Sequence, residues 1–367
     1  SHLPIRIAGE VKGFDPTVYI PLKEARRMSR ASQLAMAAGT QAMADAGLGE
    51  RVPDPERSGI IIGTGIGGFD EGLNAWETFK EQGLRRVNPF TAMALLCNLP
   101  AHHVSTQFQC QSYSSTVVTA CAAGTHAIGE AYHMIRSGMA DAMFTGGVES
   151  TITPLGVAGF NAMRALSTRN EAPEKASRPF ERDRDGFVMG EGAAILILEE
   201  LGGALQRGAY IYAEVIGFGA SADAYHLTAP HPEGGGLRVA LRDALAAAGA
   251  SPADIAFINA HGTGTRENDR VESLFFHDQF PGVPFGSTKG FTGHTLGAAG
   301  AIEAAFTIAA LELRKIPATA GFEVPDPELP AHPSRMPTAI SGTMALSQTL
   351  AFGGNNSILI FSAEPNA

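Results

Sequence analysis

The sequence predicts an α/β fold in which helices cover the faces of a parallel or mixed sheet. Short apolar or β-branched runs alternate with longer segments of helical periodicity, which is the pattern of strand–helix–strand units. Hydrophobic residues make up 44% of the 367 residues, enough for a large buried core, and 43 glycines supply many tight turns. The two halves repeat the same order of elements without a strong sequence repeat, so a duplication is suggested by topology alone.

We divide the chain into a first half over residues 1–208 and a second half over 209–367. In the first half the patterns predict helices over 32–46 and 122–137 and strands over 59–63, 117–119, 142–145 and 193–198. The second half has predicted helices over 235–248 and 297–313 and predicted strands over 211–218, 255–259, 338–345 and 357–361. Residues 154–190 are crowded with charge and proline, and we expect them to form a surface excursion over the functional site.

Composition excludes several classes of protein. The net charge of −10 argues against nucleic-acid binding, which needs a basic surface. The three cysteines, Cys97, Cys110 and Cys121, form neither a disulfide framework nor a CxxC zinc site, which fits a reducing compartment. No apolar stretch approaches the ~20 residues of a membrane span, and the start of the chain lacks signal-peptide features. We therefore expect a cytoplasmic location and no membrane partner.

Cys121 is the first candidate catalytic residue. It follows a β-branched run and precedes a helix, and its neighbours Ala120, Ala122, Ala123 and Gly124 are small enough for a tight corner. Helix amides and the macrodipole would favour the thiolate, so we expect a pKa below the ~8.5 of free cysteine. The alternative is a buried, inert cysteine.

A glycine motif and two histidines stand out elsewhere. Gly63, Gly65 and Gly68 form GxGxxG directly after a strand, but no acidic residue ends a second strand at the expected distance, so a structural turn is favoured over a dinucleotide site. His261 and His294 lie in polar, glycine-rich segments near strand ends, where α/β enzymes collect catalytic groups. Each could instead be a structural histidine or a metal ligand. Neither has a second ligand at helical spacing, so no metal is expected.

Lys289 and Glu303 flank the second histidine in the sequence. A lysine near an imidazole would keep that ring neutral and orient it, and a buried glutamate would offset the lysine charge. The alternative is a surface salt bridge.

Four motifs in this order resemble the β-ketoacyl-acyl carrier protein synthases, the elongating branch of the thiolase-fold condensing enzymes. These motifs are TACAAGT, NAHGTGTREND, STKGFTGHTLGAAGAIE and FGGNN, and the segments RIAGEVKGFDP, SRPFERDRDGFVMGEGA and LTAPHPEG extend the similarity over nearly the whole chain. The order Cys, His, His separates this branch from chain-initiating synthases (Cys, His, Asn) and from thiolases, which use a second cysteine. The resemblance implies a duplicated five-layer α/β/α/β/α sandwich with mixed sheets, a homodimer, and a site where the halves meet.

The resemblance also implies a role for each motif residue. Cys121 matches the acylated nucleophile, and His261 and His294 match the pair that assists malonyl decarboxylation. Lys289 matches the lysine that orients the second histidine, with Glu303 as its acidic partner. The remaining matches are Thr263 and Thr265 as hydroxyls for the carrier's phosphopantetheine arm, Phe352 as the gating residue whose N–H completes the oxyanion hole with that of Cys121, Leu96 in the acyl pocket, and Lys23, Arg26 and Arg27 as a basic carrier-docking patch.

Two departures from the family pattern concern chain length. The usual FGFGGTN is replaced by Leu350, Ala351 and FGGNN, which would reshape the gating loop and alter the acyl chains accepted. A leucine at position 96 predicts room for medium or long chains. Family members also begin with a further strand and helix ahead of residue 6, so we expect that the start of the family's fold is missing from this sequence.

The predicted function is decarboxylative condensation of malonyl carrier protein with an acyl group held on Cys121, without a metal or redox cofactor. Phosphopantetheine would arrive on the carrier protein. The alternatives are a non-catalytic chain-length partner of a heterodimer, a ketosynthase dedicated to aryl-polyene or polyketide products, and a cysteine acyl hydrolase. Chain-length partners usually lose the nucleophile, whereas Cys121 is present.

Overall fold

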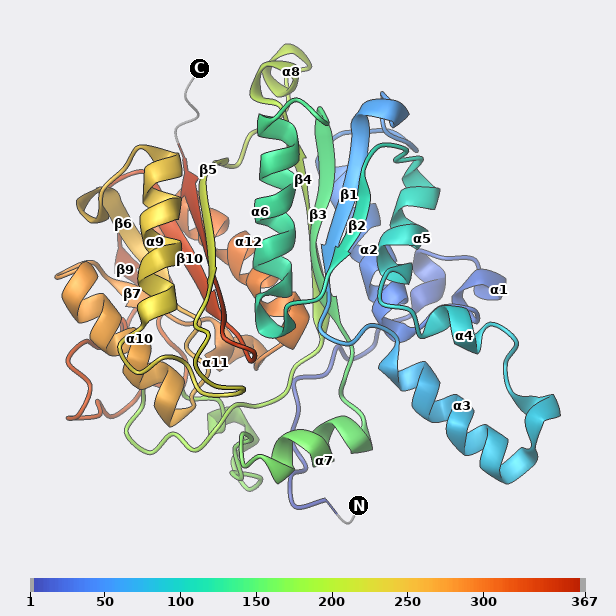
Figure 1. Ribbon diagram of the computed structural model, residues 1–367, viewed down its shortest axis with the longest axis horizontal. Helices are drawn as coiled ribbons and strands as arrows, with labels where there is room; N and C mark the ends of the chain where they lie inside the picture. Colours follow the sequence, from blue (N-terminus) through green and yellow to red (C-terminus); the bar gives the residue numbers. More distant parts are fainter. Residues whose placement is uncertain (1–2, 364–367) are drawn as a thin grey trace.

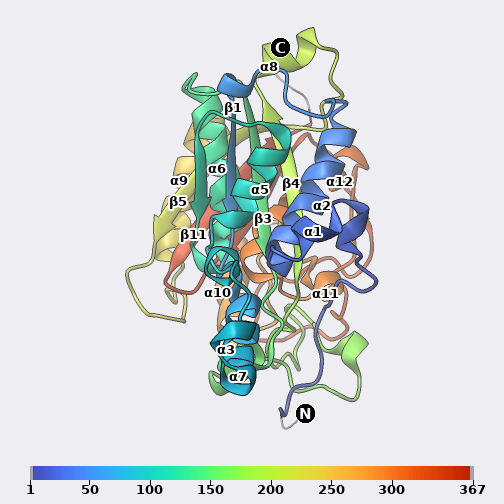
Figure 2. The ribbon, with the colours of Figure 1, turned by 90° about the vertical axis from the view of Figure 1, so that its right-hand side faces the viewer.

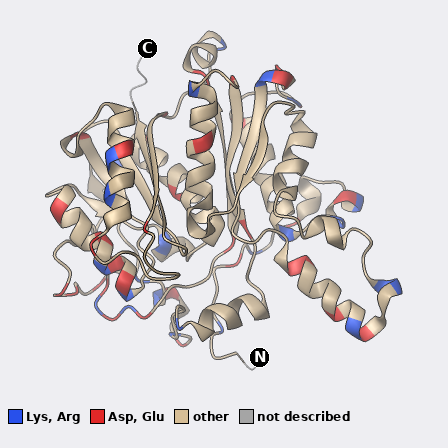
Figure 3. Cartoon of the chain, viewed as in Figure 1, with Lys and Arg blue, Asp and Glu red and all other residues tan. Residues whose placement is uncertain are grey.

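Two large β-sheets and three helical layers make up the core of the molecule, which we describe from a computed structural model covering residues 3–363. Figure 1 shows the sheets standing side by side with helices between them and on both outer faces. This arrangement confirms the predicted five-layer α/β sandwich with mixed sheets. Charged residues gather on the peripheral helices and loops, and the strands of both sheets are almost free of them (Figure 3).

The first sheet lies entirely in the first half of the chain. Its strand order is β2-β1-β3-β4, in which β4 alone is antiparallel to its neighbour. The strands are β1 (Ser58–Gly63), β2 (Ser114–Val117), β3 (Ala142–Glu149) and β4 (Gly192–Glu199). The outer face packs against α2 (Arg30–Asp45) and α5 (Leu99–Phe108). The Ser29 side chain caps α2 by accepting a hydrogen bond from the Ser32 amide.

The second sheet repeats this plan with one strand more. Its order is β5-β11-β10-β6-β7, and β11 is antiparallel to both of its neighbours. The strands are β5 (Glu214–Ala222), β6 (Ile255–Asn259), β7 (Phe285–Gly286), β10 (Met344–Leu350) and β11 (Asn355–Ser362). The helices α9 (Gly235–Ala248) and α10 (Arg266–Gln279) cover its outer face with a phenylalanine-rich core.

Two helices form the layer between the sheets, α6 (Ala123–Arg136) and α12 (Ala299–Glu312). They begin close together, and glycines permit the approach. A Cβ on Gly124 would lie 2.8 Å from the Ala301 amide nitrogen, and one on Gly300 would lie 1.9 Å from the Thr125 hydroxyl. The small residues after His294 therefore serve this contact between the two halves.

The remaining elements lie around the sandwich. Figure 1 and Figure 2 show α3 extending beyond the sheets. These elements are α1 (Leu22–Ala25), α3 (Phe69–Gln82), α4 (Thr91–Ala94), α7 (Pro154–Ala162), α8 (Leu201–Gln206), α11 (Lys289–Thr292), and the strand pair β8 (Lys315–Ile316) and β9 (Thr338–Ala339). Within residues 3–363, no helix is long and apolar enough to cross a membrane.

Several element predictions needed correction. Strand β5 begins at Glu214, three residues later than predicted, because Tyr210 and Tyr212 belong to the connection that precedes it. The strand predicted over 338–345 is two strands, β9 and β10, in different sheets. Segment 154–190 covers the site, as predicted. It is not entirely a surface segment, however, since Arg178, Phe180 and Arg184 are buried.

One edge of the first sheet is open. In the second sheet β5 pairs with β11, whereas no strand within residues 3–363 occupies the corresponding edge of β4. Residues Ala193–Glu199 of β4 are all half-buried, and Ile195–Glu199 line a cavity of about 790 Å³ shared with β5 and the connection before it. The division at residue 208 falls between the two sheets and stays a prediction.

Candidate active site

Cys121 lies at the sharp corner between β2 and α6. The corner passes through a short 3-10 turn, Ala120–Ala122, and Ala120 adopts a left-handed conformation with φ of 50°. Gly63 at the end of β1 makes room for it, because a Cβ there would lie 2.2 Å from the Ala123 carbonyl. The side chain of Cys121 is 7% exposed, so only a substrate that enters the adjoining cavity can reach the sulfur.

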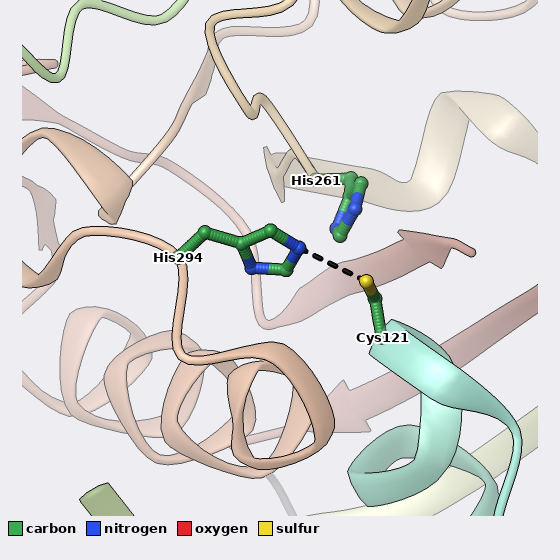
Figure 4. A group of neighbouring side chains, drawn as sticks. All are labelled: Cys121, His261 and His294. Carbon is green, nitrogen blue, oxygen red and sulfur yellow. Dashed lines mark hydrogen bonds between the residues drawn. The ribbon is translucent and has the colours of Figure 1, made fainter. Parts of the chain in front are cut away.

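Two imidazoles from the second half of the chain face this sulfur. His294 Nε2 lies 3.0 Å from Cys121 Sγ, and the His261 ring stands edge to face with the His294 ring, with centroids 5.1 Å apart (Figure 4). Both histidines are 2% exposed. The structure therefore brings together the three residues that the sequence separates by up to 173 positions.

The segment over 154–190 holds His294 in place. The His294 amide donates to the Val188 carbonyl at 2.7 Å, and the His294 carbonyl accepts from the Gly190 amide at 2.8 Å. The Phe187 ring packs edge-on against the imidazole. The excursion thus forms one wall of the site.

Lys289 contacts the first histidine, although its role was predicted at the second. Its Nζ lies 3.2 Å from His261 Nδ1 and donates to the His261 carbonyl at 2.6 Å, and it forms a buried ion pair with Glu303. Its direct contacts are thus with His261, and Lys289 reaches His294 only through its charge, which lowers the pKa of that ring. Because an ammonium only donates, Nδ1 of His261 must accept, so the ring proton is on Nε2, which faces the cavity.

Burial determines the protonation states of the reacting groups. It raises the pKa of the Cys121 thiol to about 12, even though the Lys289 charge acts in the opposite direction. The predicted low thiol pKa is thus wrong, because desolvation outweighs the charges and dipoles around the sulfur. Burial, followed by the Lys289 charge, lowers the pKa of both histidines well below its usual value. The resting site is a neutral thiol beside two neutral imidazoles.

Sequence reasoning missed the carboxylate that fixes the His261 loop. Glu272 on α10 accepts from the backbone amides of His261 and Gly262 at 2.7 and 2.6 Å, and also from Asn268 and Gln348. Burial raises its pKa to about 7. The sequence offered one signal for this role, namely an acidic residue in the helix that directly follows the His261 loop.

A cavity of about 570 Å³ opens onto Cys121 and both histidines. Thr263 and Thr265 line it, with their hydroxyls 2.9 Å apart, as do Leu350 and Phe352. The Phe352 amide also reaches the Cys121 sulfur, where it lowers the thiol pKa slightly. The apolar lining on the other side includes Phe160, Met163, Phe187 and Leu296.

Leu96 does not lie in this cavity. It follows α4, is 44% exposed, and is not among the residues that line the space around Cys121. Within this chain, the prediction that Leu96 lines the acyl pocket is therefore wrong. The helical segment around α4 packs beside α3 and apart from the reacting groups (Figure 1).

The three predicted docking residues lie on or next to α1. Lys23 and Arg26 are exposed and form no ion pair or hydrogen bond through their side chains in the described part of the chain. The Arg27 guanidinium already has partners: it forms an ion pair with Glu24 at 3.6 Å and stacks over the Phe90 ring. None of the three lines the cavity at Cys121.

The ligand atoms of Cys121, His261 and His294 lie within 4.8 Å of one another, which a metal ion would fit by distance alone. The chemistry of the donor set is unfavourable. His261 carries its proton on the nitrogen that faces the cavity, and the Lys289 ammonium stands directly behind that ring. The expectation of no metal at this site stays a prediction that these contacts support.

Comparisons with known proteins identify the class to which this fold and site belong. The family model for the β-ketoacyl synthase N-terminal domain matches residues 3–204, and that for the C-terminal domain matches residues 212–323. The chain therefore belongs to the β-ketoacyl synthase family, which confirms the resemblance predicted from its motifs and its class as an acyltransferase.

Individual relatives are similar over nearly the whole chain. A 3-oxoacyl-[acyl-carrier-protein] synthase 2 from Synechocystis sp. is 43% identical over 367 residues, covering 98% of this chain and 88% of the relative. One from Staphylococcus aureus is 44% identical, covering 97% and 90%. The crystal structure of a β-ketoacyl synthase from Burkholderia phymatum superposes with a TM-score of 0.92 at 35% identity over 100% and 90% of the two chains. The ishigamide ketosynthase/chain length factor gives 0.90 at 34% over 99% and 89%.

Proposed function

We propose that this protein is an elongating β-ketoacyl-acyl carrier protein synthase. It would take an acyl group from one carrier protein onto Cys121 and join it to the two-carbon unit that malonyl carrier protein supplies. The observation that carries the proposal is the buried cluster of one thiol and two imidazoles, in which Lys289 assigns the His261 proton to the side facing the cavity. Relatives named 3-oxoacyl-[acyl-carrier-protein] synthase 2 support it.

In the first half-reaction His294 acts as the base. With Nε2 3.0 Å from the sulfur, it takes the Cys121 proton as the sulfur attacks the acyl thioester, and it returns that proton to the departing carrier thiol. A base is needed because burial disfavours a free thiolate. The amides of Cys121 and Phe352 are the proposed donors to the oxyanion of the tetrahedral intermediate.

In the second half-reaction malonyl carrier protein loses CO₂ and leaves an enolate. His261 donates to the enolate oxygen from Nε2, and His294 does so in the tautomer that carries its proton on Nε2. The enolate carbon then attacks the acyl-Cys121 carbonyl, the sulfur leaves, and the β-ketoacyl chain remains on its carrier. Neutral rings suit this role because they donate without trapping the substrate carboxylate in an ion pair.

The carrier supplies the phosphopantetheine arm, so the protein needs no cofactor of its own. The Thr263 and Thr265 hydroxyls at the cavity wall are the proposed partners of that arm. Lys23, Arg26 and Arg27 are the proposed docking surface, since carrier proteins are acidic. Leu350 and Ala351 adjoin the gate and are proposed to influence which chains are accepted.

We further propose a homodimer and a cytoplasmic location. Strand β2 is an edge of the first sheet and is flanked by Tyr113 and Val118, which are 40% and 52% exposed. An exposed edge with apolar flanks suits pairing with a second copy. A solved relative is described as a ketosynthase in complex with its chain length factor, so a heterodimer is the competing outcome.

The alternatives lack a supporting observation. A non-catalytic partner has no use for a nucleophile with a base 3.0 Å away. A hydrolase would release free acid from acyl carrier protein without malonyl carrier protein, and none of the relatives reported above is named as a hydrolase. A ketosynthase dedicated to aryl-polyene or polyketide products would differ only in the acyl chains it accepts. The mass of the acyl group found on Cys121 would distinguish these cases.

Cys121→Gln tests the assignment of the nucleophile. An amide at this position imitates the acylated sulfur, so condensation should be abolished while malonyl decarboxylation is retained or increased. The measurements are CO₂ release from malonyl carrier protein and mass spectrometry of the carrier-bound product. The intact-mass shift of the unmodified enzyme after exposure to mixed acyl carriers would report the preferred chain on Cys121.

Residual condensation by Cys121→Gln would show that another group is the nucleophile. Cys110→Ser is the matched control, because Cys110 is also buried but packs against α5 and away from the cavity. It should condense at the unmodified rate.

A further inference from the structure

A buried carboxylate behind the active site has no part in the mechanism described so far. Glu149 ends β3 and is 0% exposed. Its Oε2 accepts from the Gly65 amide at 2.7 Å and from the Gly297 amide at 3.1 Å. Gly65 belongs to the GxGxxG turn after β1, in the first half of the chain, whereas Gly297 follows His294 in the second half. One oxygen thus joins three segments across the junction between the halves.

The glycines at this junction are there to let backbone and carboxylate meet. A Cβ on Gly65 would lie 2.4 Å from Glu149 Oε2, and one on Gly297 would lie 2.3 Å from the Gly65 amide nitrogen. The glycine-rich turn therefore receives a carboxylate of the same chain instead of a dinucleotide phosphate. Burial raises the pKa of Glu149 to about 7, yet Oε2 can accept from both glycine amides whether the carboxyl is ionised or neutral, so this clamp of two hydrogen bonds holds the three segments together in either state.

The clamp lies close to the reacting groups on both sides. Gly297 is three residues after His294 and directly after Leu296, which lines the cavity and has a left-handed φ of 48°. On the other side, the Glu149 charge acts on the Cys121 thiol and raises its pKa. A displacement of His294 by about 1 Å would be enough to reduce catalysis roughly a hundredfold.

We infer that Glu149 is a positioning residue that sets the distance between His294 and Cys121 by tying the turn after β1 to the backbone after His294. The inference rests on the proposed function for its effect on condensation. Its effect on the sulfur itself can be measured without any carrier protein.

Two neutral substitutions separate the effect of the hydrogen bonds from Gly65 and Gly297 from the effect of the Glu149 charge. Glu149→Gln keeps a carbonyl oxygen that can accept from both glycine amides, whereas Glu149→Ala removes the acceptor. Because both remove the negative charge, a difference between them reports the hydrogen bonds. We expect acyl transfer to Cys121 to fall about a hundredfold in Glu149→Ala and to stay within about threefold of the unmodified enzyme in Glu149→Gln, with the KM for acyl carrier unchanged in both.

Iodoacetamide alkylation of Cys121, followed by peptide mass spectrometry, gives the substrate-free readout. The Glu149→Ala protein should alkylate at least about tenfold more slowly than Glu149→Gln, because His294 no longer accepts the thiol proton at the right distance. Leu241→Ala is the control for lost stability, since Leu241 is buried on α9 in the outer layer and does not line the cavity. It should lower the Tm and leave alkylation unchanged.

Equal alkylation and acyl-transfer rates in the Ala and Gln variants would overturn the positioning role. So would a loss in Glu149→Ala that Leu241→Ala reproduces at a matched Tm. If the unmodified enzyme failed to condense, while the two Glu149 variants still differed in alkylation, the proposed function would fail and the positioning role would stand.

Discussion

At the residue scale, the neutral thiol–imidazole pair separates this site from one built on a stable thiolate. The amides and macrodipole of the helix that follows Cys121 predict a lowered thiol pKa, yet burial raises the pKa of Cys121 to about 12. The nucleophile is therefore generated at the moment of attack, when His294 takes the proton. The position of a thiol at a helix end therefore predicts its pKa poorly where burial removes most of its contact with water.

This state predicts the pH dependence of Cys121 alkylation. The thiol pKa is about 12 and the pKa of His294 is well below its usual value, so His294 is a neutral base throughout pH 6 to 9 and the His294-assisted iodoacetamide rate should be nearly constant over that range. Stopped alkylation and peptide mass spectrometry give the profile, with Cys110, whose pKa is also raised to about 12, as the internal comparison. Cys110, which has no such base, should alkylate about tenfold faster for each added pH unit, and a sigmoidal rise for Cys121 with its midpoint between pH 6 and 9 would mean a titrating thiolate and contradict the assignment.

The contact between Lys289 and His261 predicts a split between the two half-reactions. Lys289→Met frees the His261 tautomer, so malonyl decarboxylation should fall about a hundredfold, whereas acylation of Cys121 by His294 should change little. Breaking the buried pair also leaves Glu303 uncompensated, at a cost of about 3–5 kcal/mol in stability.

The double variant Lys289→Met with Glu303→Gln removes that charge and is the form to assay. Radiolabelled CO₂ release and acyl-enzyme mass are the two measurements. Equal losses in both half-reactions would return Lys289 to the role at His294 that the motif suggested.

At the element scale, α1 presents its basic residues unequally. Lys23 and Arg26 are free of partners among the described residues, whereas Arg27 is held by Glu24 and the Phe90 ring. An acidic carrier helix would meet the two free cations first. The contribution of each residue to docking should follow this order, although the sequence pattern treats all three alike.

Charge reversal tests that order. Lys23→Glu with Arg26→Glu should raise the KM for acyl carrier about tenfold at low salt, and added salt should reduce the difference because exposed charges are screened. Arg27→Glu alone should have a smaller effect. The kcat at saturating carrier is the control, and an unchanged KM in the double variant would remove α1 as the docking surface.

The elements also show where sequence reasoning stopped. Periodicity placed α9 and β6 at their observed bounds, because the apolar residues of each recur at the spacing of its own helix or strand. It missed α5 and α10, whose faces mix polar and apolar residues: α10 turns Asn268, Asp269 and Glu272 inward to hold the His261 loop. In the sequence, acidic residues that face inward to bind a loop cannot be distinguished from acidic residues that face solvent.

At the scale of the whole molecule, the motifs predicted the five-layer fold and the meeting of Cys121 with His261 and His294. They could not show which histidine Lys289 touches, since both lie within reach of the same short helix. Glu149 was also invisible, because its partners are backbone amides of glycines 84 and 148 residues away. Contacts made through backbone groups leave no trace in residue type.

Within residues 3–363 no strand pairs with the outer edge of β4, and this has a consequence for concentrated samples of these residues. The amides and carbonyls of this edge, backed by half-buried aliphatic side chains, form a ready template for an extended segment of any other polypeptide. Concentrated or warmed samples of these residues should therefore associate through this edge in preference to the outer face that α9 and α10 cover. Dilute handling, or a short added peptide that caps the edge, is the natural remedy.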